Sequence, residues 1–147
     1  MIELYTIGFT NKSAEQFFGL LRDSAVQTIV DTRVNNGSQL SGFAKGTDLA
    51  FFARQIGGMD YRHRLDFAPT KELLTHYRAK ELTWAEYETE YLNLMDIRRV
   101  GQHINVDELH QTCLLCSEHT PEHCHRRLLA EYLQHRFGSI QIHHLVR

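Results

Sequence analysis

The sequence has no long apolar run, and it contains only three cysteines and two prolines. No stretch approaches the roughly 20 apolar residues that a helix needs to cross a bilayer, which argues against a membrane protein. Residues 1–5 carry no basic segment ahead of an apolar one, so we expect no signal peptide. Without an export signal, we expect a soluble, cytoplasmic protein whose cysteines are reduced thiols.

The sequence also has no large excess of positive or negative charge. The chain has 16 Lys and Arg against 18 Asp and Glu, a net charge of -2 with His neutral. Non-specific binding to nucleic acid needs several phosphate-neutralising cations on one face, so nucleic acid is not the favoured partner. Gly8 stands alone after its strand, so there is no dinucleotide fingerprint, and no P-loop occurs. No sequence motif indicates a particular cofactor, so the cofactor is unknown at this point.

Strand-like and helix-like patterns alternate along the 147 residues. Short apolar runs predict strands over 4–7, 28–30, 61–67, 112–116 and 140–145, and the nearly continuous run 112–116 is typical of a strand buried on both faces. Helices are expected between them. A chain of this length is the usual size of one domain. We therefore predict a single α/β domain over 1–147, with a mostly parallel sheet in a three-layer arrangement and helices on both faces.

Capping patterns mark where the helices begin. Ser13 with Gln16, and Thr83 with Glu86, have the capping-box spacing. Further helices are expected to begin at Thr47, at 69–70 and at Thr120-Pro121, and the last of these to end at Gly138.

Polar residues follow three of the predicted strands. Ligands of parallel α/β sheets bind beyond the carboxyl ends of the strands, so these clusters are expected to meet at one edge. The first strand leads to Gly8 and Asn11, and the second to Asp31 and Arg33. The buried late strand leads to the cluster 116–127, which is rich in Cys, His and Arg. The sequence therefore predicts a functional site at this edge.

The late cluster predicts an anion site. A helix N-terminus after Thr120 would offer free N–H groups and partial positive charge, and a thiol in its first turn would have a lowered pKa. We expect an enzyme-like protein that binds a phosphate- or carboxylate-bearing small molecule or a nucleotide. The candidate acid/base residues are Asp31 and Glu118, with Cys116 as a nucleophile. The candidate ligand-binding residues are Gly8, Asn11, Arg33, Thr120, Cys124, His125 and Arg126.

Other interpretations of the same residues remain open. Cys116 can pack as a small hydrophobic side chain, and the charged residues at the strand ends can form a structural ion-pair network. Zinc-dependent, hydrolase-like chemistry would use Cys and His ligands, but the spacing is not that of a standard zinc finger, so no metal is assigned. Its candidate ligands are Cys116, His119, His123, Cys124 and His125.

A non-catalytic module that binds nucleic acid or protein is the second function class. A local basic patch at Arg54, Arg62, His63 and Arg64 lies near two aromatic residues that could stack on bases. A solvated surface is the plainer interpretation of this patch. Trp84, Tyr87 and Tyr91 share one helix face, which indicates either core packing or a homodimer seam.

The chain resembles the bacterial and archaeal domain-of-unknown-function family numbered 488 over essentially its full length. The matching segments are 6–11, 30–33 and 66–74, together with Leu114-Leu115-Cys116-Ser117-Glu118 and its following Pro121, Cys124, His125 and Arg126. The resemblance implies a Rossmann-like α/β fold and no established activity.

Two departures from the family pattern stand out. Phe9 replaces a residue that is often His in the family, which weakens any mechanism that needs a base there. Residues 35–37 replace a loop that usually carries a proline.

Overall fold

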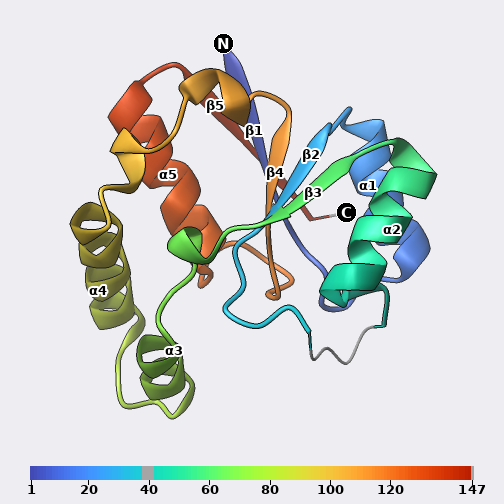
Figure 1. Cartoon of the computed structure of the whole chain (residues 1–147). Coiled ribbons are helices and arrows are strands. Elements are labelled where there is room, and N and C mark those ends of the chain that lie inside the picture. Colours follow the sequence, from blue (N-terminus) through green and yellow to red (C-terminus); the bar gives the residue numbers. More distant parts are fainter. Residues whose placement is uncertain (38–41, 147) are drawn as a thin grey trace.

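The structure is a computed structural model that describes residues 1–37 and 42–146. In these residues five strands form one parallel sheet in the order β3-β2-β4-β1-β5 (Figure 1). The strands are β1 (Ile2–Gly8), β2 (Thr28–Asp31), β3 (Asp60–His63), β4 (Thr112–Cys116) and β5 (Ile140–Leu145). The predicted parallel α/β sheet is therefore confirmed, although the third strand is shorter than the predicted segment 61–67.

The central strand β4 is buried at every position, as its apolar sequence predicts. Because side chains alternate across a strand, Leu114 contacts the core on one face while Cys113 and Leu115 contact the core on the other. This double burial requires helices on both sides of the sheet.

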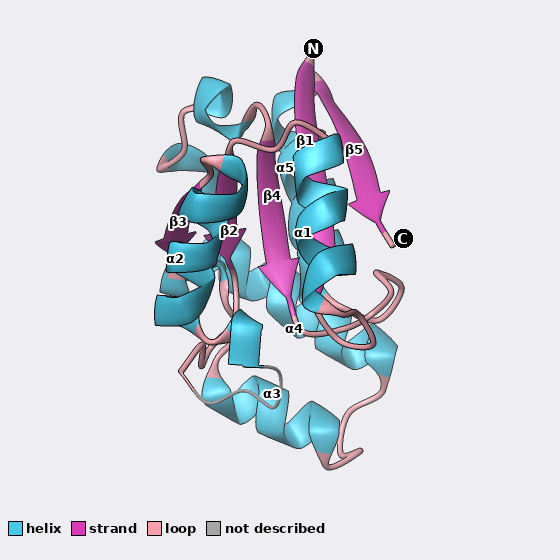
Figure 2. Ribbon diagram, turned by 90° about the vertical axis from the view of Figure 1, so that its right-hand side faces the viewer, coloured by secondary structure: helices cyan, strands magenta, loops and turns pink. Residues whose placement is uncertain are grey.

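Helices cover both faces of the sheet (Figures 1 and 2). On one side α1 (Ala14–Asp23) and α2 (Gly46–Gly57) enclose a core with the strands, and on the other α5 (His125–Phe137) does so with α4 (Trp84–Ile97) alongside. The fold is thus a three-layer, Rossmann-like α/β arrangement. Short 3-10 turns occupy Gly42–Ala44, Leu65–Phe67, Val100–Gln102 and Val106–Leu109.

Helix α3 (Lys71–Arg78) covers neither face of the sheet. It lies beyond the carboxyl ends of the strands, below the sheet in Figure 2. The Thr70 hydroxyl caps its first turn by accepting from the N–H of Leu73, so this helix begins where the sequence predicts. Helix α3 thus lies near the strand ends, where the sequence predicts a site.

Two predicted helix starts are wrong. Helix α2 begins at Gly46 after Lys45, with no side-chain cap, and not at Thr47. Helix α5 begins at His125 and not after Thr120, because residues 117–124 wrap around the side chain of Arg126 before the helix can form. Both capping boxes, at Ser13 and Thr83, are confirmed.

Within residues 1–37 and 42–146, no helix combines the length and the apolar character needed to cross a membrane.

Candidate functional site

A cleft of about 440 Å³ lies over the ends of the neighbouring strands β2 and β4. Segments 33–35 and 116–118 form its floor, helix α3 and the start of α4 form one wall, and segment 123–125 forms another. The volume lies within the usual range of small-molecule pockets. The open cleft is therefore at the carboxyl edge of the sheet, where the sequence predicts a site.

One face of α3 lines this cleft. Lys71, Leu74, Thr75 and Arg78 recur at the i, i+3, i+4, i+7 spacing that places side chains on one side of a helix. Lys71 and Arg78 are exposed, and neither forms an ion pair with another described residue. The helix thus supplies two uncompensated positive charges to the cleft.

Aromatic side chains form the wall beside these cations. The rings of Trp84 and Tyr87 stack with centroids 5.3 Å apart, and Tyr77 lies 4.8 Å from Tyr87. His123 stacks on Trp84 at 4.8 Å and joins this wall to the loop before α5. Such rings offer faces and edges to a planar ligand. Tyr87 is 2% exposed and Tyr91 is fully buried, so for these two the core role is confirmed.

Asp31 and Arg33 form a buried ion pair with each other. Nε and Nη2 of Arg33 donate to the two Asp31 carboxylate oxygens at 2.8 and 2.6 Å, and the Tyr61 hydroxyl donates to Oδ2. Nη2 of Arg33 also donates to the Ala44 carbonyl. Burial and the hydrogen bond to Asp31 raise the pKa of Tyr61 to about 12. Asp31 is fully buried and does not line the cleft.

Arg126 is fully buried and has a different set of partners. Its Nη1 donates to the Glu118 carbonyl at 2.6 Å and to Sγ of Cys124 at 3.5 Å, and its Nη2 donates to the His119 carbonyl. Its Nε lies 3.4 Å from the Thr6 hydroxyl oxygen and donates to it. Burial lowers its pKa to about 10. No described carboxylate forms an ion pair with Arg126.

Gly8 makes room for this arrangement. A Cβ atom at Gly8 would overlap the backbone carbonyl of Glu118 and lie 2.9 Å from Nη1 of Arg126. The missing side chain therefore lets the loop after β4 pass directly over the end of β1. The N–H and hydroxyl of Thr10 donate to the Ser117 carbonyl and hold this loop in place. The space next to the carboxyl ends of β1 and β4 is therefore occupied by the protein's own loop.

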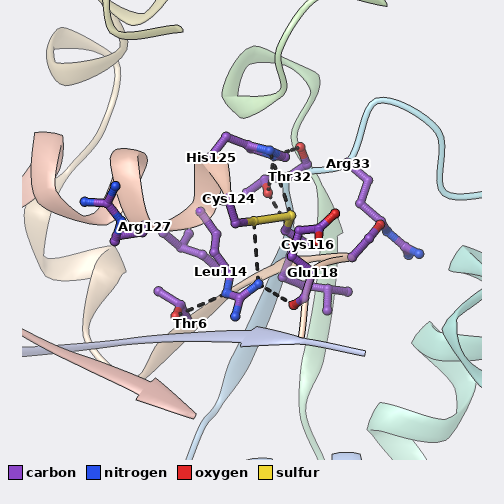
Figure 3. The surroundings of a disulfide bond; sticks show 12 residues. Thr6, Thr32, Arg33, Leu114, Cys116, Glu118, Cys124, His125 and Arg127 are labelled. Atoms are coloured by element: carbon purple, nitrogen blue, oxygen red, sulfur yellow. Dashed lines mark hydrogen bonds between the residues drawn. A yellow bond between two sulfur atoms is a disulfide. The ribbon is translucent and has the colours of Figure 1, made fainter. Parts of the chain in front are cut away.

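The side chain of His125 is buried beside two sulfur atoms (Figure 3). Its Nε2 donates to the Thr32 carbonyl at 2.8 Å, and its Nδ1 lies 3.8 Å from Sγ of Cys116. Burial lowers its pKa to about 4, so the imidazole is neutral near pH 7. The Nε2 hydrogen bond leaves the unprotonated Nδ1 facing the sulfur.

Cys116 and Cys124 form a disulfide (Figure 3). The expectation of reduced thiols is therefore wrong for this pair, while Cys113 is a free, buried thiol. The reason is spatial: the loop around Arg126 returns the chain to the end of β4, so a cysteine eight residues later meets Cys116. Neither sulfur is a free nucleophile in this state.

The late start of α5 also changes the predicted anion site. Thr120 is exposed and lies outside the cleft, and Cys124 has extended backbone angles as the residue before the helix. The predicted helix N-terminus at Thr120-Pro121 therefore does not exist to hold an anion.

The structure brings only part of the predicted site to the cleft. Arg33, Cys116, Glu118, Cys124 and His125 line it. Gly8, Asn11, Asp31, Thr120 and Arg126 do not. The guanidinium of Arg33 is directed away from Cys116 and His125 toward its own partners (Figure 3).

Sequence reasoning missed the contribution of the α3–α4 segment. The spacing of Lys71, Thr75 and Arg78 is a polar helical face that could have indicated a lined cleft. The patch at Arg62 and Arg64 gains little support, because Arg64 pairs with Asp66 and covers the ring of Phe67.

Comparison with known proteins gives one result. No curated protein and no solved structure matches the chain. A family model described as "Domain of unknown function DUF488" matches residues 13–133, a range that includes β2, β4 and every residue that lines the cleft. The chain therefore belongs to the DUF488 family.

Proposed function

We propose that the cleft binds an anionic small molecule that carries a planar ring, with a nucleotide as the best fit. The single observation that carries this proposal is the pair of unpaired cations, Lys71 and Arg78, on the face of α3 that lines the cleft. Among the described residues that line the cleft, Glu118 is the one carboxylate, so positive side chains predominate there. Phosphate groups are the natural counter-charge for such a surface.

The aromatic wall supports a ring-bearing ligand. Tyr77, Trp84 and His123 are accessible at least in part, and they lie beside the cations of α3. Stacking between a base and an aromatic side chain contributes about 1–3 kcal/mol per base. The cleft therefore offers cations for a phosphate group and aromatic side chains for a ring. Inorganic phosphate can use only the cations, because it has no ring.

An enzymatic role would rest on Glu118. This exposed carboxylate lines the cleft, whereas Asp31 is enclosed by Arg33 and Tyr61. We assign Glu118 as the candidate acid/base residue and Asp31 as a structural partner of Arg33. A cytoplasmic location, in which nucleotides are abundant, stays a prediction from the sequence.

Trp84 is the single tryptophan of the chain and provides a direct test. Titration with mononucleotides should change Trp84 fluorescence saturably, and inorganic phosphate should change it less. The Arg78→Ala variant should weaken nucleotide binding at least tenfold, which corresponds to about 1.4 kcal/mol. Lys71→Ala should act in the same direction.

The matched control is Arg62→Ala, an exposed cation on β3 that does not line the cleft. Equal weakening by Arg62→Ala and Arg78→Ala would indicate general charge attraction and would contradict the proposal. A flat titration with all mononucleotides would also overturn it. Binding of oligonucleotides that depends on Arg62 would favour the nucleic-acid module instead.

A further inference from the structure

Three side chains of the types that bind zinc converge where the floor of the cleft meets the wall formed by segment 123–125. The sulfur atoms of Cys116 and Cys124 and a ring nitrogen of His125 all lie within 4.8 Å of one another. All three residues are buried and all three line the cleft. Cys116 ends β4, Cys124 directly precedes α5 and His125 is its first residue, so elements of the core hold the group.

We propose that the reduced form of this Cys116–Cys124–His125 group is a zinc-binding site with its fourth position open to the cleft. Zinc takes sulfur and nitrogen ligands at about 2.3 and 2.0–2.1 Å in tetrahedral geometry. Sγ of Cys116 and Nδ1 of His125 are 3.8 Å apart, which suits two donors on one ion. Three protein ligands with one free position is the pattern of catalytic zinc centres.

The hydrogen bond of His125 prepares the ring for this role. A metal-binding histidine usually donates its other ring N–H to a carboxylate or a backbone carbonyl, which fixes the ring and its tautomer. Here Nε2 donates to the Thr32 carbonyl at 2.8 Å, and the free Nδ1 faces Cys116. The Thr32 hydroxyl donates to the Leu115 carbonyl, which anchors this support to β4.

Arg126 prepares the sulfur atoms. It is a buried cation without a described carboxylate partner, and its Nη1 lies 3.5 Å from Sγ of Cys124. A thiolate on Cys124 would supply the missing negative charge. Zinc binds thiolates, so the same interaction favours the form of the cysteine that the metal needs.

The backbone spacing leaves room for an ion between the sulfur atoms. The Cα atoms of Cys116 and Cys124 are 7.4 Å apart, whereas most disulfides join Cα atoms within about 4.4–6.8 Å. A Cα separation of this size leaves space for one ion between two thiolate sulfur atoms.

The conversion balances as two steps. Two molecules of a small thiol reduce the disulfide, which yields the two cysteine thiols and the disulfide of the reductant. Zinc then binds two thiolates and the neutral imidazole, and two protons are released to solvent. This site does not depend on the nucleotide proposal, because nucleotide binding uses the cations of α3.

Cobalt(II) is the probe for the test, added to the reduced full chain. We expect one equivalent to bind, with a thiolate-to-cobalt charge-transfer band and the strong visible absorption of four-coordinate cobalt. Added zinc should displace it and remove both signals. His125→Ala and Cys124→Ser should abolish the charge-transfer band, whereas Cys113→Ala, the matched control thiol outside the group, should keep it.

Circular dichroism and thermal melting show whether each variant is folded. If a ligand variant unfolds, proton release from the wild type on zinc addition decides the matter: release of one or two protons per bound zinc supports the site, and none overturns it. Cobalt binding that survives unchanged in Cys124→Ser would place the metal on other histidines and contradict the proposal. If the reduced protein binds no cobalt, the proposal is overturned, and Cys116 and Cys124 are a disulfide-forming pair without a metal. Each of these outcomes is separate from the Trp84 fluorescence response to nucleotides.

Discussion

Arg33 and Arg126 are both buried arginines near the strand ends, with exposures of 4% and 0%, but their partners differ in kind. Arg33 forms a two-point ion pair with the Asp31 carboxylate. Arg126 is held by carbonyls, a hydroxyl and a sulfur, and it has no described carboxylate partner. A buried charge is tolerated when it is paired and costly when it is not.

This difference in partners indicates a structural role for Arg33, whereas the surroundings of Arg126 leave room for a change of charge. At Arg33 the chain supplies its own counter-charge, so the charge is balanced without a ligand, although the buried Nη1 of Arg33 has no hydrogen-bond partner among the described residues. At Arg126 no described carboxylate forms an ion pair, and the positive charge is stabilised by carbonyl and hydroxyl dipoles, by the more distant carboxylates of Glu118 and Glu122, and by a sulfur atom that becomes negative on reduction and deprotonation. A negative charge can therefore be added next to Arg126. The sulfur atoms of Cys116 and Cys124 can carry this charge after reduction and deprotonation.

The largest expected effect comes from breaking the Arg33 pair. Asp31→Asn leaves a buried guanidinium without its counter-charge, so the free energy of unfolding should fall by about 3–5 kcal/mol. Urea unfolding followed by circular dichroism measures this loss. Adding Arg33→Met to Asp31→Asn should recover part of it, because no unpaired charge then stays buried.

Asp66→Asn is the matched control for Asp31→Asn. It breaks the ion pair with Arg64. The side chain of Arg64 is 29% exposed and that of Asp66 is 41% exposed. The loss should stay below about 1 kcal/mol, because water screens exposed ion pairs. Equal losses in the two variants would show that the Asp31 pair is not the anchor described here.

The next effect tests the arrangement around Arg126. Gly8→Ala would force the Glu118 carbonyl away from the end of β1 and disturb its hydrogen bond from Arg126. Overpacking of this kind should cost about 3 kcal/mol. Gly19→Ala, in α1 with open space around it, should instead stabilise by about 0.5–1 kcal/mol. Thermal melting compares the two variants, and a stable Gly8→Ala protein would contradict the described close approach.

The sequence predicted the sheet well because its signals are local. The buried run Thr112–Cys116, the capping boxes at Ser13 and Thr83 and the left-handed Gly138 each depend on neighbouring residues. The edge of the sheet on which the polar clusters lie also follows, since the carboxyl ends of parallel strands share one edge.

The inner organisation of the site could not be predicted in the same way. Pro121 is a good first helical residue, but helix α5 begins only at His125. The loop before it is held by hydrogen bonds from Arg126 to the Glu118 and His119 carbonyls, and long-range hydrogen bonds tie Ser117 to Thr10 and Arg126 to Thr6. Which residue of a polar cluster faces a cleft depends on pairing across the fold. Asp31 is paired with Arg33, whereas α3 brings Lys71 and Arg78 to the cleft from a segment outside the three polar clusters at the strand ends.

The smallest effect refines the comparison at the Arg33 end. Tyr61→Phe removes one hydroxyl that donates to the Asp31 carboxylate and accepts from Asn36. The ion pair itself remains, so the loss should be about 1.5 kcal/mol, the lower range for a hydrogen bond to a charged group. Tyr132→Phe, which removes an exposed hydrogen bond to Asp96, should cost clearly less in the same urea titration. If Tyr61→Phe matched Asp31→Asn, the hydroxyl and not the guanidinium would be the main partner of Asp31, and the contrast between the two arginines would lose its basis.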